Sequence, residues 1–337
     1  MKCFPKGARV VFIGDSLTSG GTWVSHVYDQ YLRNDPHCGI RMYNCGISGG
    51  CTTSAIDSLE ENGWFYRPTH AVILLGINDV GRHLYRLPDG KEAFEDLRLE
   101  ERLQRLSDYS HGMDALVSML QGRGVHVTIL SPSVFNESQD PTHLREIGID
   151  AACEYMAEQN RRLAMRKGCE YMNLHAVMRY LLTMRNVARP DRVHLEPDGQ
   201  ILLAKLFLAE QGMLPAPDLS TPASAMAFLD GAKEECNPLL RKNQARHAAA
   251  YALRRVGDAS YLIARHAGNA SDAEKMAYVK KFRETAQDFW ADLADRYIAG
   301  YPCKQEMLQD VIRLTDACAI PDSEIQESLQ ENPENMH

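Results

Sequence analysis

The sequence predicts an α/β fold built on a parallel β-sheet, followed by a separate all-helical region. Strand-like apolar runs alternate with helical patterns through residues 1–213, which is typical of a parallel sheet with helices on both faces. After Pro215-Ala216-Pro217 the composition shifts to helix formers and strand-like runs cease. A length of 337 residues also favours two domains, because one domain usually takes roughly 100 to 200 residues.

Five short apolar runs predict the strands of the sheet. They span residues 9–13, 39–43, 71–75, 125–130 and 169–173. The third run is continuously apolar, which indicates a strand buried on both faces, as the strands of a parallel sheet are.

Helices are expected between these strands. Between the first two strands, six apolar residues fall on one face of a helix: Trp23, Val24, Val27, Tyr28, Tyr31 and Leu32. The next helix ends before Gly122 and Gly124, and another, spanning about residues 144–167, ends before Gly168. A last helix, rich in leucine, ends at Gly212 and is expected to pack on the sheet.

Residues 218–325 are predicted to form a small helical bundle. Thr221-Pro222 and Asn237-Pro238 each combine an N-cap residue with proline at the first helical position. An apolar stripe follows, made of Met276, Val279, Phe282, Phe289, Trp290, Leu293 and Tyr297. Such a stripe can serve as the core of the bundle, as a contact with the first domain or as a contact with a second copy in a homo-oligomer. A lid over the first domain is a further alternative, and the acidic segment 326–337 is expected to be a disordered tail.

The charge balance and the cysteines exclude several classes of partner and compartment. The net charge is -8, and lysine and arginine are dispersed along the chain, which argues against nucleic acid and anionic membranes as partners. No apolar stretch has the length of a membrane span, and the first strand begins too close to Met1 to leave room for a secretory signal. The 9 cysteines are scattered without a Cys-x-x-Cys pair, as expected of reduced thiols. We therefore expect a cytoplasmic protein.

A serine follows the first predicted strand, in the segment Val10-Val11-Phe12-Ile13-Gly14-Asp15-Ser16-Leu17-Thr18. A strand that delivers Ser16 into a turn opening a helix places its hydroxyl at the carboxyl edge of the sheet, where open α/β sheets bind ligands. The helix end and nearby N–H groups would favour negative charge there. The segment differs from the Gly-x-Ser-x-Gly elbow of the α/β-hydrolases because Thr18 replaces the second glycine.

The segment Asp191-Arg192-Val193-His194 supplies the groups that a serine nucleophile needs. In a turn-like segment, residues three apart face the same side, so the Asp191 carboxylate can hold Nδ1–H of His194 while Nε2 points at Ser16. Serine is a weak nucleophile without such a base. The alternative is a local hydrogen bond beside a helix start, with no catalytic role. Metal ligation also fits the residue types, but no further cluster with ligand spacing is visible in the sequence.

Two further segments are expected to supply hydrogen-bond donors to a developing oxyanion. Asn44-Cys45-Gly46-Ile47-Ser48-Gly49-Gly50 closes the second predicted strand, and Gly49 can present its N–H there beside the Ser16 N–H. Asn78 follows the third strand and can donate from its side-chain amide. Glycine-rich turns and asparagines at strand ends are also ordinary structural features.

The four segments together resemble the SGNH hydrolases, the GDSL-type lipases and esterases. The four blocks of that family are named for a serine, a glycine, an asparagine and a histidine, which here are Ser16, Gly49, Asn78 and His194. The resemblance implies that Asp191 is the third member of a catalytic triad. It also implies a flavodoxin-like three-layer α/β/α sandwich.

The resemblance extends from about Arg9 to Gly212, within an expected catalytic domain of residues 1–213. One departure is Gly50, where many members of the family carry an acidic residue. The departure leaves the chemistry intact and affects the finer shape of the pocket.

Two loops are expected to border the substrate. The loop after the third strand carries Arg82, His83 and Tyr85, and the loop after the fourth strand carries Phe135. Such side chains can hold a sugar or an acidic group. They can equally form surface ion pairs or cover the edge of the sheet.

By family analogy, these features favour a serine esterase that hydrolyses a small, acetyl-type ester of a carbohydrate or another small polar molecule through an acyl-enzyme. No metal or organic cofactor is expected. Three alternatives stay open: an acyltransferase with the same triad, a thioesterase or lysophospholipase, and a binding protein with a vestigial pocket.

Overall fold

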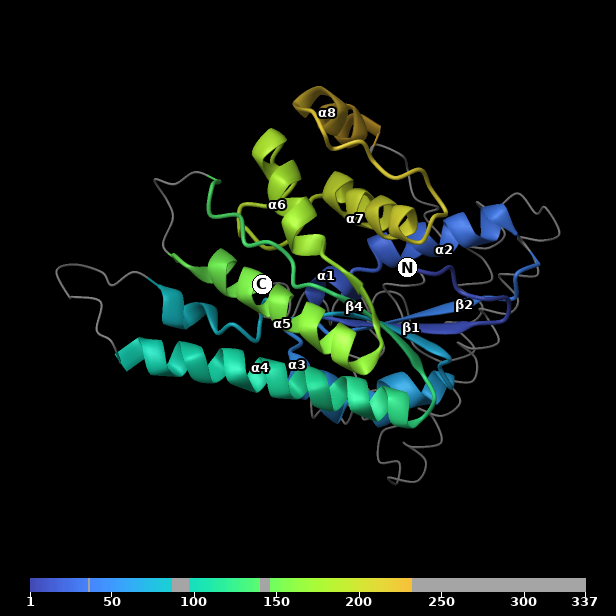
Figure 1. The fold of residues 1–337 in the computed structure, drawn as a ribbon, viewed down its shortest axis with the longest axis horizontal. Helices are drawn as coiled ribbons and strands as arrows, with labels where there is room; N and C mark the ends of the chain where they lie inside the picture. The colour runs from blue at the N-terminus through green and yellow to red at the C-terminus, as the bar shows by residue number, and fades with distance from the viewer. Residues whose placement is uncertain (36, 87–96, 140–145, 232–337) are drawn as a thin grey trace, which may run out of the picture.

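The computed structural model describes residues 1–35, 37–86, 97–139 and 146–231 and shows a five-stranded parallel sheet between two layers of helices (Figure 1). The strands are β1 (Arg9–Gly14), β2 (Arg41–Gly46), β3 (His70–Leu74), β4 (His126–Leu130) and β5 (Glu170–Met172). Their order across the sheet is β2-β1-β3-β4-β5, and every neighbouring pair is parallel. This is the flavodoxin-like order, so the expected three-layer α/β fold is confirmed.

The helices connect the strands and cover both faces of the sheet. They are α1 (Ser16–Ser19), α2 (Thr22–Asn34), α3 (Thr52–Asp57), α4 (Leu97–Gly122), α5 (Ile149–Lys167), α6 (Leu174–Met184), α7 (Pro197–Glu210) and α8 (Pro222–Asp230), with short turns η1 (Leu59–Gly63), η2 (Trp64–Tyr66) and η3 (Arg82–Tyr85). Helices α2 and α7 pack together on one face, while α3, α4 and α5 lie on the other (Figure 1). Among the described residues, no helix is both long and apolar enough to span a membrane.

Aromatic packing fixes the face of the sheet that α2 and α7 cover. Trp23 of α2 and Phe207 of α7 are fully buried, with ring centroids 5.9 Å apart, and the Trp23 ring meets Phe12 of β1 edge-on at 5.1 Å. Burying one such side chain stabilises a fold by about 1.5–3 kcal/mol. Helix α7 follows directly after His194, so this packing also anchors the segment that carries the histidine.

Strand β2 differs from the sequence-based expectation. It spans Arg41–Gly46, whereas residues 39–43 were expected. The strand begins later because Gly39 has a positive φ of 62°, a turn conformation. It ends later because Asn44 and Gly46 still pair with Phe12 and Gly14 of β1.

Two helices also differ from expectation. The helix that Ser16 opens is a single turn, because the chain turns at Gly21 (φ 73°) before α2 begins. Its N-terminal dipole is therefore much smaller than that of a long helix. Helix α6 was not predicted, although Asn173 caps its N-terminus by accepting from the Ala176 N–H (3.1 Å).

The start of the C-terminal region is partly described. Helix α8 begins as the sequence predicts, with Thr221 as N-cap and Pro222 at the first helical position. The rest of the predicted helical bundle, from residue 232 onward, and the predicted tail 326–337 lie outside the described residues. The domain boundaries stay a prediction.

Candidate active site

The turn after β1 presents Ser16 at the carboxyl edge of the sheet. Asp15 is the N-cap of α1, and its buried carboxyl group accepts a hydrogen bond from the Leu17 N–H (2.9 Å). Gly14 cannot be replaced without a clash, because a Cβ there would lie 2.9 Å from the Leu74 carbonyl oxygen and would overlap Thr18 Oγ1. The turn can therefore approach β3 closely only with glycine before Asp15.

The structure brings Ser16, His194 and Asp191 together across a sequence separation of 178 residues. His194 Nε2 lies 2.7 Å from Ser16 Oγ, and His194 Nδ1 lies 2.7 Å from Asp191 Oδ2. With Nδ1–H donating to the carboxylate, Nε2 is the acceptor for the serine hydroxyl. This is the arrangement of nucleophile, base and orienting acid that activates a serine.

The Asp191 carboxylate is held in its charged form. Its second oxygen, Oδ1, accepts from the backbone N–H groups of Val193 (3.0 Å) and His194 (2.9 Å). Partial burial acts to raise the pKa of Asp191, but these two bonds and the bond from the His194 ring hold the pKa well below its ordinary value. A charged carboxylate at this position stabilises an imidazolium on His194.

The backbone donors expected near Ser16 lie on neighbouring loops. Gly49 is exposed, has a φ of 68°, and follows β2 by three residues, next to the end of β1. Neither its N–H nor that of Ser16 has an acceptor among the residues that the structure describes. Both N–H groups are therefore free to donate to a ligand.

Asn78 joins the loops on either side of β1. Its Nδ2 donates to the Gly50 carbonyl at 2.9 Å, which links the loop after β3 to the loop after β2. A primary amide has two N–H groups, so the second is left for another acceptor. The half-buried Asn78 can thus brace the Gly49 loop and still donate to a ligand.

Two buried polar residues support these loops and were not singled out from the sequence. Asn44 Nδ2 donates to the carbonyls of Thr18 (2.9 Å) and Ser19 (3.1 Å), so the end of β2 holds α1 in place. Asp79 accepts from Thr52 at both its N–H (2.9 Å) and its hydroxyl (2.7 Å). The available signal was a polar side chain near the end of a strand: Asn44 lies within β2, and Asp79 lies in the loop that follows β3.

The carboxyl of Asp15 is electrostatically unusual. Burial raises its pKa to about 7, against the opposing effects of the Leu17 N–H and of His194, and the nearby Asp79 carboxyl adds to the rise. Burial likewise raises the pKa of Asp79. The site therefore lies over two carboxyl groups that resist ionisation.

The loop residues expected to contact substrate have mixed positions. Arg82 donates to Glu146 (2.9 Å), its guanidinium lies 5.1 Å from the centre of the Phe135 ring, and His83 is exposed. Phe135 is fully buried and Tyr85 is buried to 4% exposure. The two aromatic side chains can support the wall of a site from behind, whereas Arg82 and His83 are accessible to a ligand. Direct contact of any of the four with substrate stays a prediction.

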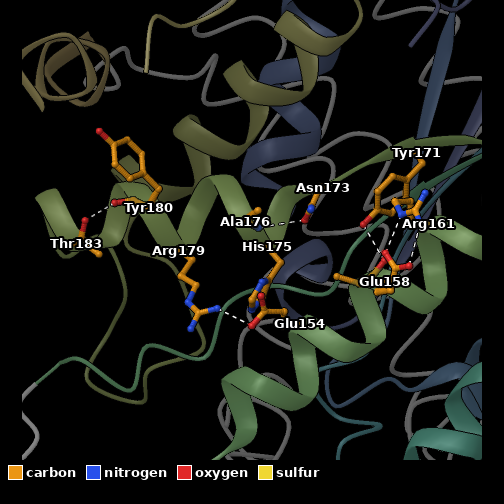
Figure 2. Close-up of a pocket in the computed structure, with 11 residues that line it drawn as sticks. Glu154, Glu158, Arg161, Tyr171, Asn173, His175, Ala176, Arg179, Tyr180 and Thr183 are labelled. Atoms are coloured by element: carbon orange, nitrogen blue, oxygen red, sulfur yellow. Dashed lines mark hydrogen bonds and ion pairs between the residues drawn. The ribbon is translucent and has the colours of Figure 1, made fainter. Parts of the chain in front are cut away.

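A separate cavity of about 420 Å³ lies between α5 and α6 (Figure 2). Its charged lining is paired internally: Arg161 with Glu158 at 2.7 Å and Arg179 with Glu154 at 2.7 Å. Ser16 and His194 do not line it. Within the described part of the chain, no group of three or more His, Cys, Asp or Glu side chains is arranged to hold a metal ion.

This chain is similar in sequence to a known family and to a known enzyme. The model of the GDSL-like lipase/acylhydrolase family matches residues 12–201. An acetylxylan esterase from Geobacillus stearothermophilus is 26% identical over 224 residues, which are 61% of this chain and 94% of that protein.

Solved structures show the same fold. A gut microbial diltiazem-metabolizing enzyme has a TM-score of 0.53 and 24% identity, over 63% of this chain and 48% of that one. A catalytic mutant of the acetylxylan esterase Axe2 from Geobacillus stearothermophilus has a TM-score of 0.50 and 24% identity, over 63% of this chain and 97% of that one. In the catalytic mutants of Axe2, an aspartate, a serine and a histidine are each replaced by alanine.

Proposed function

The chain belongs to the GDSL-like lipase/acylhydrolase family, and we propose that within this family it is a serine esterase that removes small, acetyl-type groups from a carbohydrate or another small polar molecule. The protein is a carboxylic ester hydrolase, as its family and its acetylxylan esterase relative indicate. The proposal adds the nucleophile, the acyl-enzyme and the substrate class.

The first half of the reaction forms an ester on Ser16. His194 Nε2 accepts the hydroxyl proton as Ser16 Oγ attacks the carbonyl carbon of the substrate. Asp191 stabilises the imidazolium through its 2.7 Å contact with Nδ1. The bond to the leaving alcohol then breaks, and His194 returns the proton to the alcohol oxygen.

The second half releases the acid. Water gives a proton to His194 and attacks the acyl carbon, and Ser16 leaves with that proton restored to its oxygen. In both halves, negative charge develops on the carbonyl oxygen. The N–H groups of Ser16 and Gly49 and the free N–H of the Asn78 amide are the proposed donors to it, each worth about 2.7–4 kcal/mol in the transition state.

The substrate class rests on two kinds of support. The relative from Geobacillus stearothermophilus is an acetylxylan esterase, an enzyme named for a small acyl group on a sugar polymer. In this chain, the loop beside the site carries the half-buried Arg82 and the exposed His83, which are side chains that bind hydroxyl or acidic groups.

The single observation that carries the proposal is the pair of 2.7 Å contacts that join Ser16 to His194 and His194 to Asp191. The test is hydrolysis of 4-nitrophenyl acetate, butyrate and octanoate and of an acetylated xylo-oligosaccharide by the wild type, Ser16→Ala and Ser19→Ala. Ser19 lies on the same helical turn and bonds the Ser16 carbonyl (3.3 Å), so it is a matched control.

We expect acetate to be the best chromogenic ester, Ser16→Ala to lose turnover and Ser19→Ala to keep it. A rate that rises with chain length would instead favour a thioesterase or lysophospholipase. Diversion of the acyl group to an added sugar alcohol would favour a transferase. Equal rates for the wild type and Ser16→Ala would refute the proposal.

A further inference from the structure

Arg192, between Asp191 and His194, has an unusual backbone conformation. Its φ is 69°, and among the described residues only Arg67 is another non-glycine residue with a positive φ. This left-handed region disfavours residues with a Cβ, so the surrounding structure must stabilise it. Backbone strain of this kind is common where a side chain has to be placed for function.

The left-handed turn at Arg192 folds the loop back on itself. Arg189 begins a turn with Pro190 at its second position, and the Arg192 N–H closes it by donating to the Arg189 carbonyl (2.9 Å). The next two N–H groups, of Val193 and His194, then both reach Oδ1 of Asp191. An αL residue directly after a tight turn commonly serves this purpose, and glycine is the usual residue there.

The side chain of Arg192 stabilises this turn through hydrogen bonds to a neighbouring loop. Arg192 is buried to 8% exposure, and its Nη1 donates to the carbonyls of Asn136 (3.1 Å) and Gln139. In return, the Asn136 N–H donates to the Arg192 carbonyl at 2.9 Å. Side chain and backbone of Arg192 are thus both held by the loop that follows β4.

That loop is itself firmly attached. Asn136 Nδ2 donates to Asn186 (3.0 Å), and Glu137 Oε1 accepts from the N–H groups of Gly148 (2.8 Å) and Asp150 (3.1 Å) at the start of α5. The loop that holds Arg192 is therefore itself hydrogen-bonded to the start of the long helix α5.

We propose that Arg192 is a positioning residue for the reaction: its buried guanidinium holds the left-handed turn that keeps the Asp191 carboxylate on His194 and the imidazole aimed at Ser16. The proposal rests on the proposed function of that triad. In this proposal Arg192 contacts neither the substrate nor the reacting atoms. It acts through the geometry of Asp191 and His194.

Three substitutions separate the effect of the left-handed backbone from the effect of the guanidinium. Arg192→Ala removes the guanidinium and keeps the steric cost of a Cβ. Arg192→Gly removes the guanidinium but accepts the left-handed backbone without strain, so this variant is expected to fold. Arg192→Lys retains a charged donor that can reach one carbonyl. Arg67→Ala is the matched control, since Arg67 has the same backbone type (φ 47°) and an exposed side chain away from the site.

Because a displacement of about 1 Å in a catalytic group can cost about a hundredfold in rate, we expect Arg192→Ala to lower kcat for an acetyl ester by about ten- to a hundredfold while KM changes less than about twofold. Arg192→Gly should also lose kcat, Arg192→Lys should recover part of it, and Arg67→Ala should retain the wild-type value. Wild-type kcat in both Arg192→Ala and Arg192→Gly would overturn the proposal.

A second readout does not depend on turnover. The proton shared between His194 Nδ1 and Asp191 should give a low-field proton NMR signal in the wild type and in Arg67→Ala. In Arg192→Gly, with a circular dichroism spectrum like that of the wild type, the signal should broaden or disappear. If the wild type shows no Ser16-dependent hydrolysis, the proposed function fails, and the NMR signal still decides whether Arg192 positions the pair; an unchanged signal in Arg192→Gly contradicts this role.

Discussion

The side-chain amide of Asn44 donates to the carbonyl of Thr18 at 2.9 Å and so attaches the turn that carries Ser16 to the end of the neighbouring strand. A second bond, to the Ser19 carbonyl at 3.1 Å, comes from the same nitrogen. Asn44 is fully buried, and its Oδ1 accepts from the Gly46 N–H (2.9 Å), so the same amide bonds both the turn and β2. The position of Ser16 is thus set by β2 as well as by β1.

Asn44→Ala is expected to destabilise the protein by about 1–3 kcal/mol, because it removes the bonds to the Thr18 and Ser19 carbonyls and takes away the acceptor of the Gly46 N–H. It should also lower kcat, because the turn that carries Ser16 loses its attachment. Urea unfolding and acetyl ester hydrolysis measure the two effects. Asn34→Ala is the control: Asn34 is exposed and accepts from Gln30 on the helix surface, so a change below about 0.5 kcal/mol is expected. Equal stability of the two variants would contradict this account.

Gly14→Ala is expected to destabilise the protein by at least about 1–3 kcal/mol through overpacking. The added Cβ would meet Thr18 and lie 2.9 Å from the Leu74 carbonyl oxygen. Gly20→Ala, six residues along the same segment, should be tolerated because its Cβ would lie 3.9 Å from the nearest atom outside its immediate chain neighbours, the Ser16 carbonyl oxygen. Thermal unfolding of both variants checks the difference, and a tolerated Gly14→Ala would show that the turn can shift.

Asp15→Asn should make stability less dependent on pH. The folded-state pKa of Asp15 is raised from 3.8 to about 7, so the folded protein holds a proton that the unfolded chain releases. The stability linked to this proton is fully present below about pH 4 and is lost as the pH rises through about 7.

The variant should therefore gain stability relative to the wild type between pH 4.5 and pH 8, by as much as about 4 kcal/mol at the upper end. An asparagine oxygen can still cap the Leu17 N–H, which limits other effects. Urea unfolding at several pH values measures the gain. A constant difference between variant and wild type would show that Asp15 does not titrate in this range.

Asp191→Asn should lower kcat by roughly a hundred- to ten-thousandfold with little change in KM, because an amide favours the wrong tautomer of His194 and does not stabilise the imidazolium. Asp198→Asn, in the first turn of α7, is the matched control and should keep wild-type kcat. Steady-state kinetics on an acetyl ester decides between them.

The lowered pKa of Asp191 also predicts how the stability of the protein depends on pH. The contribution of this carboxylate is present above its ordinary pKa and is lost only as the pH falls through the lowered folded-state value. The stability difference between the wild type and Asp191→Asn should therefore persist down to about pH 4 and shrink below it. A difference that fades already between pH 7 and 5 would point to another group.

The sheet could be predicted because its strands are short apolar runs that end in polar or glycine-rich turns. The run from Ala71 to Leu75 is continuously apolar, which predicts a buried strand, and the strand forms over His70–Leu74. The second strand was misplaced because Asn44 and Gly46 are typical turn residues, while in the fold their pairing with β1 continues. At these two residues, pairing with the neighbouring strand outweighs their local preference for turns.

The candidate site was predictable where its chemistry is local. Asp191 and His194 are three residues apart, so their contact could be inferred from spacing alone. The support from Asn136 could not, because it bonds Arg192 across 56 residues and through a backbone oxygen that any residue carries. The burial of Phe135 was equally hidden, since an aromatic residue in a loop fits a ligand wall and a core position alike.

The most direct test of the central claim is covalent labelling of the nucleophile. An aryl phosphonofluoridate reacts only with an activated hydroxyl, and peptide mass spectrometry locates the adduct. We predict one adduct per chain, on Ser16, that forms rapidly in the wild type, slows strongly in His194→Ala and is absent in Ser16→Ala. An adduct on another residue, or labelling of Ser16 at the same rate without His194, would contradict the account.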